Sequence, residues 1–305
     1  MIVITAKVHS FLTETLINRG YEISYTPTIS YEELKEKIGF VEGLIVTTRI
    51  PVNRELLEKA DRLKWIARLG SGMELIDVEY AESRNIKCIS SPEGNSNAVA
   101  EHALGMLLNV MRNISKSREE IQNKIWLREE NRGLEISGKT IGIIGYGNTG
   151  SAFVKILSSF DVTVLVYDKY KFGFSSHYIK EASFEQVCKY SDVISLHIPL
   201  NAETTQMCSK PFFDKIESSP ILINTSRGGI INTTFLIEAL KGGKISGAAL
   251  DVLENENINQ LVGQQLVDFN ILATHPKVVI TPHIAGYSEE AFLNMSKILI
   301  NKLGI

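Results

Sequence analysis

Short apolar runs alternate with amphipathic stretches along the whole sequence, and this alternation constrains the fold more than any other feature. Amphipathic stretches such as residues 11–19 and 53–60 separate the runs. The apolar runs cover residues 2–4, 43–47, 65–68 and 86–89 in the first half, and 140–144, 162–167, 193–197, 221–224, 247–250 and 278–281 in the second. Strands and helices that alternate in this way form parallel sheets covered by helices on both faces. The predicted fold class is therefore α/β.

The length of the chain favours two domains. A chain of 305 residues exceeds one ordinary core and suits two. Residues 97–115 are apolar at helical spacing and are expected to form a helix that joins the halves. The polar stretch 116–132 is expected to be mostly a solvated helix face, and residues 288–303 form the last helical pattern. We predict two Rossmann-like, doubly wound parallel-sheet domains.

Composition excludes several classes of protein. Hydrophobic residues make up 44% and charged residues 22%, as in ordinary soluble proteins. The net charge of −3 gives no basic surface for nucleic acid or an anionic membrane, and no run approaches the roughly 20 apolar residues of a membrane span. The N-terminus has an apolar run but no basic start or cleavage site. The three cysteines show no paired spacing, so a reducing, cytoplasmic location is expected.

A glycine-rich turn follows the apolar run 140–144. It reads Gly145-Tyr-Gly147-Asn-Thr-Gly150 and opens a helical pattern. Gly145 permits a tight turn, Gly147 lets the backbone approach a pyrophosphate, and Gly150 lets the helix pack closely on the strand. The free N–H groups of the helix N-terminus then bind the phosphate. The turn predicts a bound dinucleotide, although methyltransferases that use S-adenosylmethionine share such a turn.

Asp168 stands at the end of the next apolar run, where a carboxylate binds the ribose hydroxyls of a dinucleotide. A carboxylate there repels the 2′-phosphate of NADP, so NAD is the predicted cofactor. Lys169, the next residue, opposes this preference.

Three further apolar runs are each followed by a residue suited to acid–base chemistry. Arg227 follows run 221–224, Glu256 follows run 247–250 together with Asp251, and His283 follows run 278–281. Because the carboxyl ends of parallel strands meet at one edge, these side chains can converge. A histidine exchanges the proton of an alcohol, a carboxylate orients it, and a guanidinium binds an α-carboxylate. Each has an ordinary structural alternative, such as a surface ion pair for Arg227.

These residues also carry a family resemblance. The sequence resembles the D-isomer-specific 2-hydroxyacid dehydrogenases along nearly its whole length, at residues 68–72, 94–101, 145–150, 195–201, 224–229, 249–256 and 282–283. We therefore expect a flavodoxin-like substrate-binding domain at residues 1–96, completed by 287–305, and an NAD-binding Rossmann domain at residues 97–286. Two positions depart from the family: Asn257 replaces a usual proline, which could loosen the loop of Glu256, and Glu74 replaces a usual aspartate.

The resemblance implies roles for single residues. Catalysis falls to Arg227, Glu256 and His283. The substrate carboxylate would be bound by the backbone of Ser71 and Gly72, which suits an anion nest. NAD would be surrounded by Gly145, Gly147, Asn148, Thr149, Gly150, Asp168, Thr225, Ser226, Ala285 and Gly286, with Asp251 at the nicotinamide carboxamide.

Within the family, the phosphoglycerate dehydrogenases without a C-terminal regulatory domain are the most similar, since the sequence ends soon after His283. The predicted reaction interconverts 3-phosphoglycerate and 3-phosphohydroxypyruvate, as in serine biosynthesis, with Arg49, Arg68 and Arg128 at the phosphate. Two alternatives remain open. One is a glyoxylate or hydroxypyruvate reductase, and the other is a dinucleotide-sensing binding protein like the corepressors built on this fold.

The remaining expectations concern assembly and other polar residues. A small-molecule 2-oxo or 2-hydroxy acid is the expected partner, and an isologous homodimer is expected through the apolar helix 97–115. No metal is expected, because the other histidines lack ligand spacing. The residues expected to be structural are Asn97 and Glu101, which would open the helix, and His197.

Overall fold

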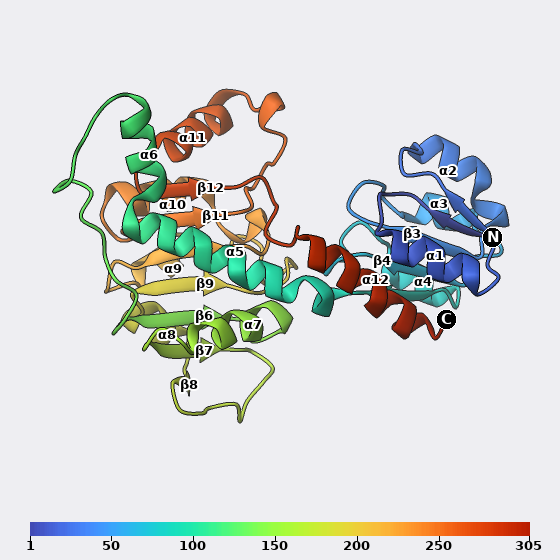
Figure 1. Ribbon diagram of the computed structural model, residues 1–305, viewed down its shortest axis with the longest axis horizontal. Coiled ribbons are helices and arrows are strands. Elements are labelled where there is room, and N and C mark those ends of the chain that lie inside the picture. The colour runs from blue at the N-terminus through green and yellow to red at the C-terminus, as the bar shows by residue number, and fades with distance from the viewer. The chain divides into compact units, whose positions relative to one another are not determined.

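The computed structural model describes all residues from Met1 to Ile305. The chain divides into two compact units, residues 1–98 with 286–305 and residues 99–285. Each unit contains one parallel sheet, of five and of seven strands (Figure 1). The predicted α/β class with two parallel-sheet domains is confirmed. None of the helices is long and apolar enough to cross a membrane.

The first unit has the strand order β2-β1-β3-β4-β5, with every pair parallel. This is the flavodoxin-like order. Its strands are β1 Ile2–Ile4, β2 Ile23–Tyr25, β3 Gly43–Val46, β4 Trp65–Arg68 and β5 Lys87–Ser90. Its helices are α1 Ser10–Asn18, α2 Tyr31–Lys37, the 3-10 turn Ile38–Phe40, α3 Arg54–Glu58, α4 Val78–Ser83 and α12 Glu289–Leu303.

The two faces of this sheet bury different helices. Successive side chains of a strand point to opposite faces, so Val3 packs with α2, α3 and α4, whereas Ile4 packs with α1 and α12. Helix α12 and strand β1, from opposite ends of the sequence, therefore share one hydrophobic core. Leu299 and Ile300 of α12 are both buried in that layer.

The second unit has the order β12-β11-β10-β9-β6-β7-β8, again with every pair parallel. This is a Rossmann order with one added strand. Its strands are β6 Thr140–Ile144, β7 Thr163–Tyr167, β8 Ile179–Glu181, β9 Val193–Leu196, β10 Ile221–Asn224, β11 Gly247–Leu250 and β12 Val278–Ile280. Its helices are α6 Ile114–Gln122, α7 Asn148–Leu157, α8 Phe184–Tyr190, α9 Lys210–Asp214, α10 Thr233–Lys241, α11 Gly263–Thr274 and the 3-10 turns Gly228–Ile230 and Ile258–Gln260.

The long helix α5, Pro92–Arg112, starts in the first unit and continues along one face of the seven-stranded sheet (Figure 1). Its apolar side chains, including Met106 and Leu107, are buried with α7 against that face. Helices α8, α9 and α10 cover the other face. The apolar side chains of α5 are therefore buried in the core of the second unit.

Several element boundaries differ from the sequence prediction. Helix α5 begins at Pro92, so Asn97 and Glu101 lie inside it and do not open it as predicted. A proline suits a first helical position because its missing N–H would have no partner there. Helix α6 ends at Gln122, so the predicted helix face over residues 116–132 is wrong beyond that residue. The sequence prediction also lacked the short strands β2 and β8.

Candidate active site

The glycine-rich turn lies at the carboxyl end of β6, the strand between β9 and β7. Gly145 has φ +98°, which favours glycine, and a Cβ there would lie 2.4 Å from the carbonyl oxygen of His197. A Cβ on Gly150 would lie 2.1 Å from the carbonyl oxygen of Gly145. A Cβ on Gly147 would meet nothing within 4 Å. Two glycines thus permit close packing, and the third faces open space. Contact of this turn with a pyrophosphate stays a prediction.

The N-terminus of α7 faces the same space. Its N-cap is Gly147, so no side chain caps the first turn. The N–H groups of Asn148 and Thr149 are the first of the helix and have no partner within it. A ten-residue helix with an uncapped N-terminus after a glycine turn fits a pyrophosphate.

Asp168 stands directly after β7 and is anchored by backbone groups. Its Oδ2 accepts a hydrogen bond from the N–H of Tyr146 at 2.7 Å. Its Oδ1 accepts from the N–H groups of Tyr170 at 2.9 Å and Lys171 at 3.0 Å. A carboxylate offers about four acceptor positions, so Oδ2 retains one for a ribose hydroxyl. The side chain is thereby held beside the glycine turn.

The turn after β10 carries Thr225, Ser226 and Arg227. Buried Asn224 fixes it, because its Oδ1 accepts from the N–H of Ser226 at 3.0 Å and its Nδ2 donates to the carbonyl of Arg227 at 2.9 Å. Nη1 of Arg227 donates to the carbonyl of Ser226 at 2.7 Å. A Cβ on Gly228 would overlap the backbone of Leu253 at 1.9 Å, so the two loops lie in contact.

Thr225 and Ser226 differ in how their hydroxyls are used. Oγ of Ser226 donates to the carbonyl of Leu196 at 2.7 Å, which ties this turn to β9. Oγ1 of Thr225 is buried and has no hydrogen-bond partner within the chain. Such a buried hydroxyl fits a bound polar group.

His283 and Glu256 are brought together, as the sequence analysis expected of them. Nδ1 of His283 lies 2.9 Å from Oε2 of Glu256. The two side chains are 39% and 46% exposed, so a small molecule can reach the pair. With Nδ1 turned to the carboxylate, Nε2 is the ring nitrogen left for a substrate.

His283 has a backbone conformation that few residues other than glycine adopt, with φ +56°. Asp251 stabilises it. The N–H of His283 donates to the carbonyl of Asp251 at 2.8 Å, and the carboxylate accepts from the N–H groups of Ile284 at 2.9 Å and Ala285 at 2.8 Å. Asp251 is therefore committed to the turn that carries His283. Its contact with the nicotinamide carboxamide stays a prediction.

Two further groups contact this carboxylate. Oγ1 of Thr281 donates to Oδ1 of Asp251 at 2.6 Å, and Nε2 of His102 lies 3.0 Å from Oγ1 of Thr281 and 3.5 Å from Oδ1. Burial alone raises the pKa of the Asp251 carboxyl, but the hydrogen bonds from His102, Thr281, Ala285 and Ile284 outweigh it and leave the pKa below its ordinary value. The carboxylate is therefore ionised near neutral pH.

The sequence analysis assigned no role to His102. The signal was present, because His102 lies between Val99 and Met106, at helical spacing from both, on the apolar side of this helix. Such a residue needs a polar partner inside the fold.

Asn257, which the sequence analysis expected could loosen the loop of Glu256, forms a hydrogen bond within that loop. The N–H of Asn257 donates to Oδ1 of Asn255 at 3.0 Å. A proline at this position has no N–H and could not form that bond. The asparagine thus supplies a local restraint of its own.

The three arginines predicted at a phosphate have separate surroundings. Arg49 is exposed, and its Nη2 donates to the carbonyl of Thr5 at 2.6 Å. Arg68 is 8% exposed, and its guanidinium lies over Gly70, where a Cβ would be 1.8 Å from Nη1. Arg128 belongs to the second unit and follows exposed Trp126 in the loop after α6. Their joint action on a phosphate stays a prediction.

Ser71 and Gly72 stand just after the turn at Gly70, which has φ +127°. The N–H of Gly70 donates to Oγ of buried Ser91 at 3.1 Å, and the N–H of Ser91 donates back to the carbonyl of Gly70 at 2.9 Å. The start of this loop is therefore fixed to the end of β5. Binding of a carboxylate by Ser71 and Gly72 stays a prediction.

His197 has the structural role that the sequence analysis expected. It is buried, and its Nε2 lies 2.9 Å from Oγ of Ser195. Burial lowers the pKa of its imidazole to about 4, so the ring is neutral at physiological pH. No group of three or more His, Cys, Asp or Glu side chains is arranged to hold a metal ion.

Comparisons with known proteins give the family. The NAD-binding domain of the D-isomer specific 2-hydroxyacid dehydrogenases matches residues 104–285. D-3-phosphoglycerate dehydrogenase of Archaeoglobus fulgidus is 34% identical over 282 residues, 92% of this chain and 52% of that protein. The chain thus spans about half the length of that relative.

Two other proteins are matched over nearly their full length. Hydroxypyruvate reductase of Thermotoga maritima is 31% identical over 291 residues, 95% of this chain and 93% of that protein. The crystal structure of a D-lactate dehydrogenase from Aquifex aeolicus, complexed with NAD and lactic acid, superposes with a TM-score of 0.83 at 27% identity, covering 100% of this chain and 94% of that one. The chain belongs to the D-isomer specific 2-hydroxyacid dehydrogenase family and carries its NAD-binding domain.

Proposed function

We propose that this protein is an NAD-dependent dehydrogenase that interconverts a D-2-hydroxyacid and its 2-oxoacid. The observation that carries the proposal is the hydrogen bond between His283 and Glu256. Both residues follow strands of the sheet that bears the glycine turn, at its carboxyl edge. The pair that would exchange the proton therefore lies on the same sheet as the turn that would bind the dinucleotide.

Each residue has a distinct part in this reaction. Nε2 of His283 accepts the hydroxyl proton during oxidation and returns it during reduction. Glu256 holds the ring through Nδ1 and stabilises its protonated form. Bound NAD supplies the acceptor for the hydride that leaves the same carbon. Arg227, which follows the neighbouring strand β10, binds the α-carboxylate or polarises the carbonyl oxygen.

The cofactor-binding roles rest on the same sheet. The backbone N–H groups of Asn148 and Thr149 bind the pyrophosphate, and Asp168 binds the ribose. Thr225 and Ser226 contribute from the adjoining turn, where the buried Oγ1 of Thr225 supports a polar ligand. Ala285 and Gly286 contribute from the turn after His283.

We propose 3-phosphohydroxypyruvate as the substrate, because a D-3-phosphoglycerate dehydrogenase is among the relatives at 34% identity. Ser71 and Gly72 would bind its carboxylate, and Arg49, Arg68 and Arg128 would bind its phosphate. The test is the specificity constant with NADH for 3-phosphohydroxypyruvate, hydroxypyruvate and glyoxylate. Arg49→Gln should lower it about tenfold for the phosphorylated acid alone. A wild-type preference for an unphosphorylated acid would reject the phosphate role.

A reductase of hydroxypyruvate or glyoxylate is the second candidate. The nearly full-length match to a hydroxypyruvate reductase favours it. So does Arg68, whose guanidinium is buried over Gly70. The same substrate panel decides between the two. A dinucleotide-sensing binding protein remains the alternative of another class, and the lack of turnover with every acid in the panel, despite NADH binding, would favour it.

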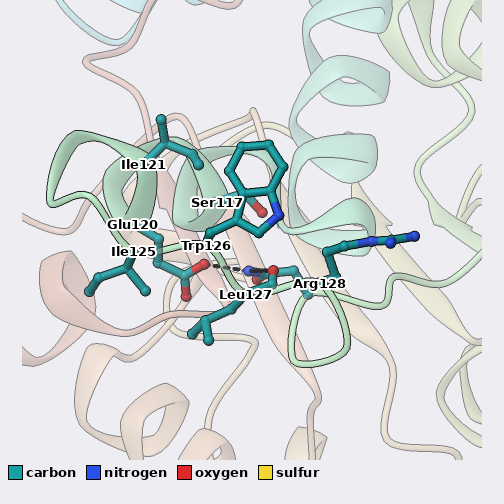
Figure 2. A pocket seen from close by; sticks show the side chains of 8 residues that line it. Ser117, Glu120, Ile121, Ile125, Trp126, Leu127 and Arg128 are labelled. Atoms are coloured by element: carbon teal, nitrogen blue, oxygen red, sulfur yellow. Dashed lines mark hydrogen bonds between the residues drawn. The ribbon is translucent and has the colours of Figure 1, made fainter.

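We also propose a two-fold homodimer, through a surface other than the apolar face of α5. Exposed apolar side chains gather on α6 and the loop after it, around a hollow of about 160 Å³ (Figure 2). Trp126 is 78% exposed there, and Ile121 and Ile125 are 52% and 43% exposed. Burial of such a cluster favours association. Light scattering should give twice the mass of 34.0 kDa, whereas a monomer mass at micromolar concentration would reject the dimer.

A cytoplasmic location completes the proposal. Cys88, Cys188 and Cys208 are all free thiols, and none forms a disulfide. Free, unpaired thiols suit a reducing compartment.

A further inference from the structure

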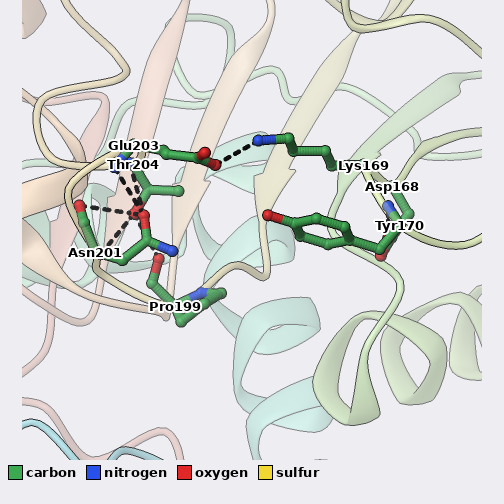
Figure 3. Close-up of polar contacts among 7 residues, drawn as sticks. All are labelled: Asp168, Lys169, Tyr170, Pro199, Asn201, Glu203 and Thr204. Atoms are coloured by element: carbon green, nitrogen blue, oxygen red, sulfur yellow. Dashed lines mark hydrogen bonds and ion pairs between the residues drawn. The ribbon is translucent and has the colours of Figure 1, made fainter.

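An ion pair joins the two loops that flank the glycine turn. Lys169 follows β7 and Glu203 follows β9, and both strands pair with β6 on its two sides. Nζ of Lys169 donates a hydrogen bond to Oε2 of Glu203 (Figure 3). The pair therefore crosses the carboxyl end of β6, from which Gly145 starts the turn. In doubly wound sheets this position is the switch point where a dinucleotide binds.

The loop that carries Glu203 is held in place by its own hydrogen bonds. Oδ1 of Asn201 accepts from the N–H groups of Glu203 at 2.9 Å and Thr204 at 3.0 Å, and Oγ1 of Thr204 donates to the carbonyl of Pro199 at 2.7 Å (Figure 3). Such a turn fixes the backbone below the carboxylate.

The backbone below Lys169 is fixed as well. The carboxylate of Asp168 accepts from the N–H groups of Tyr170 and Lys171. Nζ of Lys169 also lies 5.4 Å from the centre of the Tyr170 ring. The second lysine of the loop is engaged elsewhere, because Nζ of Lys171 donates to the carbonyl of Tyr146 at 2.7 Å. Lys169 follows Asp168 directly and is paired with Glu203. The strength of that pair therefore decides whether Lys169 can bind a ligand.

We propose that Glu203 determines cofactor specificity by holding Lys169, so that this lysine does not bind the 2′-phosphate of NADP. The inference rests on the proposed dinucleotide site and adds a residue to it. A cation next to the ribose carboxylate accommodates a 2′-phosphate. Glu203 engages that cation in advance and adds a second negative charge beside the ribose. The 2′-hydroxyl of NAD leaves the pair intact, whereas a phosphate must compete with Glu203 for Lys169.

The charges of the pair agree with this role. The hydrogen bond with Glu203 raises the pKa of Lys169, and the hydrogen bond with Lys169 lowers the pKa of Glu203. Both side chains are therefore charged throughout the neutral range. A change in the preference for NAD between about pH 6 and 8 would therefore come from the 2′-phosphate of NADP, whose second pKa is about 6, and not from this pair.

The test compares cofactor binding by the full chain before and after removal of one charge. Glu203→Gln keeps the size of the side chain but removes its charge, so that Lys169 is held less firmly. The dissociation constants for NADH and NADPH are measured by titration calorimetry at low ionic strength, without substrate. We expect the ratio of the NADPH constant to the NADH constant to fall about tenfold, through tighter binding of NADPH. An equal unfolding temperature for variant and wild type shows that the fold is intact.

A second ion pair of the same unit offers a matched control. Nζ of Lys189 lies 3.3 Å from Oε1 of Glu217, and the glutamate is 61% exposed, as is Glu203. Lys189 also lies over the next residue, Tyr190, as Lys169 lies over Tyr170. Glu217 precedes β10, at the amino edge of the sheet. Glu217→Gln removes the same charge and should leave the ratio unchanged.

The double variant Glu203→Gln with Lys169→Gln tests whether the tighter binding of NADPH depends on Lys169. It should lose the gain in NADPH binding, because the released cation is gone. Two results would overturn the proposal: an unchanged ratio in Glu203→Gln, which includes an equal gain for both cofactors, or a gain that survives in the double variant. The last would mean that Glu203 repels the phosphate directly.

Failure of this inference is distinct from failure of the proposed function. A wild-type chain that binds neither NADH nor NADPH would reject the dinucleotide site itself. A wild-type chain that binds NADH and reduces a 2-oxoacid, with a ratio that Glu203→Gln does not change, would reject only the role of Glu203.

Discussion

Oδ2 of Asp251 lies 2.8 Å from the backbone nitrogen of Ala285, so a buried carboxylate holds the turn that presents His283. The turn needs this anchor because His283 adopts a left-handed conformation, which costs a residue with a Cβ about 1–2 kcal/mol. Fixing the backbone on both sides of His283 also limits the directions in which Nε2 can point.

Asp251→Asn should weaken both the fold and catalysis. The amide cannot accept hydrogen bonds at both ends, so one buried N–H loses its partner and about 1–3 kcal/mol of stability at pH 7 is lost. The pKa of Asp251 is lower in the folded chain than in the unfolded chain. The carboxylate therefore stabilises the fold above about pH 4, and this stabilisation is lost as the pH falls below that value. Urea unfolding should show a difference from wild type at pH 7 that shrinks near pH 3. An equal difference at both pH values would contradict the anchor.

Replacing two glycines of the same turn by alanine should affect different properties, stability in one case and cofactor binding in the other. Gly150→Ala places a Cβ against the carbonyl of Gly145 and should lower stability by about 1–3 kcal/mol. Gly147→Ala meets no atom of the chain and should unfold like wild type, but it should bind NADH at least about tenfold more weakly, since the methyl group occupies the space of the pyrophosphate. Thermal unfolding and NADH titration separate the two effects. Normal NADH binding by Gly147→Ala would place the phosphate elsewhere.

His283→Ala should lower kcat by about 10²–10⁴ in both directions, because proton exchange loses its group. The dissociation constant for NADH should stay near that of wild type, which serves as the control for folding. Steady-state kinetics with NADH and a 2-oxoacid check the first quantity, and fluorescence titration checks the second. Near-normal turnover would assign the acid–base role to another residue.

Glu256→Gln should lower kcat about tenfold or more, since the ring of His283 is less well oriented without the carboxylate at Nδ1. Steady-state kinetics with NADH and a 2-oxoacid measure this effect, and an unchanged dissociation constant for NADH is the control for folding. A kcat equal to that of wild type would show that the 2.9 Å contact has no influence on the reaction.

His197 should make the fold sensitive to acid. Its pKa falls from 6.5 to about 4 on folding, so the unfolded chain binds the extra proton between these values. Stability should decline by about 3 kcal/mol as the pH falls from 6.5 to 4, and no further loss from this residue follows below that range. His197→Gln should remove this part of the decline. Urea midpoints measured across the range, compared between the two proteins, test the sign and the size.

The sequence predicted well what its local patterns determine. The apolar runs gave the parallel sheets, and the strand-end positions of Arg227, Glu256 and His283 placed them on one sheet edge. The glycine spacing gave the turn after β6. In each case a short stretch of chain contains the whole physical reason.

Other features depend on residues far apart in sequence. The left-handed conformation of His283 requires Asp251, which comes from another strand. The role of His102 becomes visible only when Thr281 packs beside it. Strands β2 and β8 are each three residues long and each lie at the edge of their sheet, so neither leaves a clear apolar pattern. Glu203 and Lys169 likewise meet only because β7 and β9 both border β6.

The place of α12 bears on how the chain matures during synthesis. Leu299 and Ile300 complete the layer that covers Ile2 and Ile4, so β1 packs against a helix that is synthesised only after the whole second unit. The second unit lies wholly between these segments and has its own cores. The nucleotide-binding half can therefore fold while one face of the first sheet is covered by α1 alone. Until residues 286–305 emerge, the uncovered part of that face is apolar surface of the nascent chain that is exposed to aggregation.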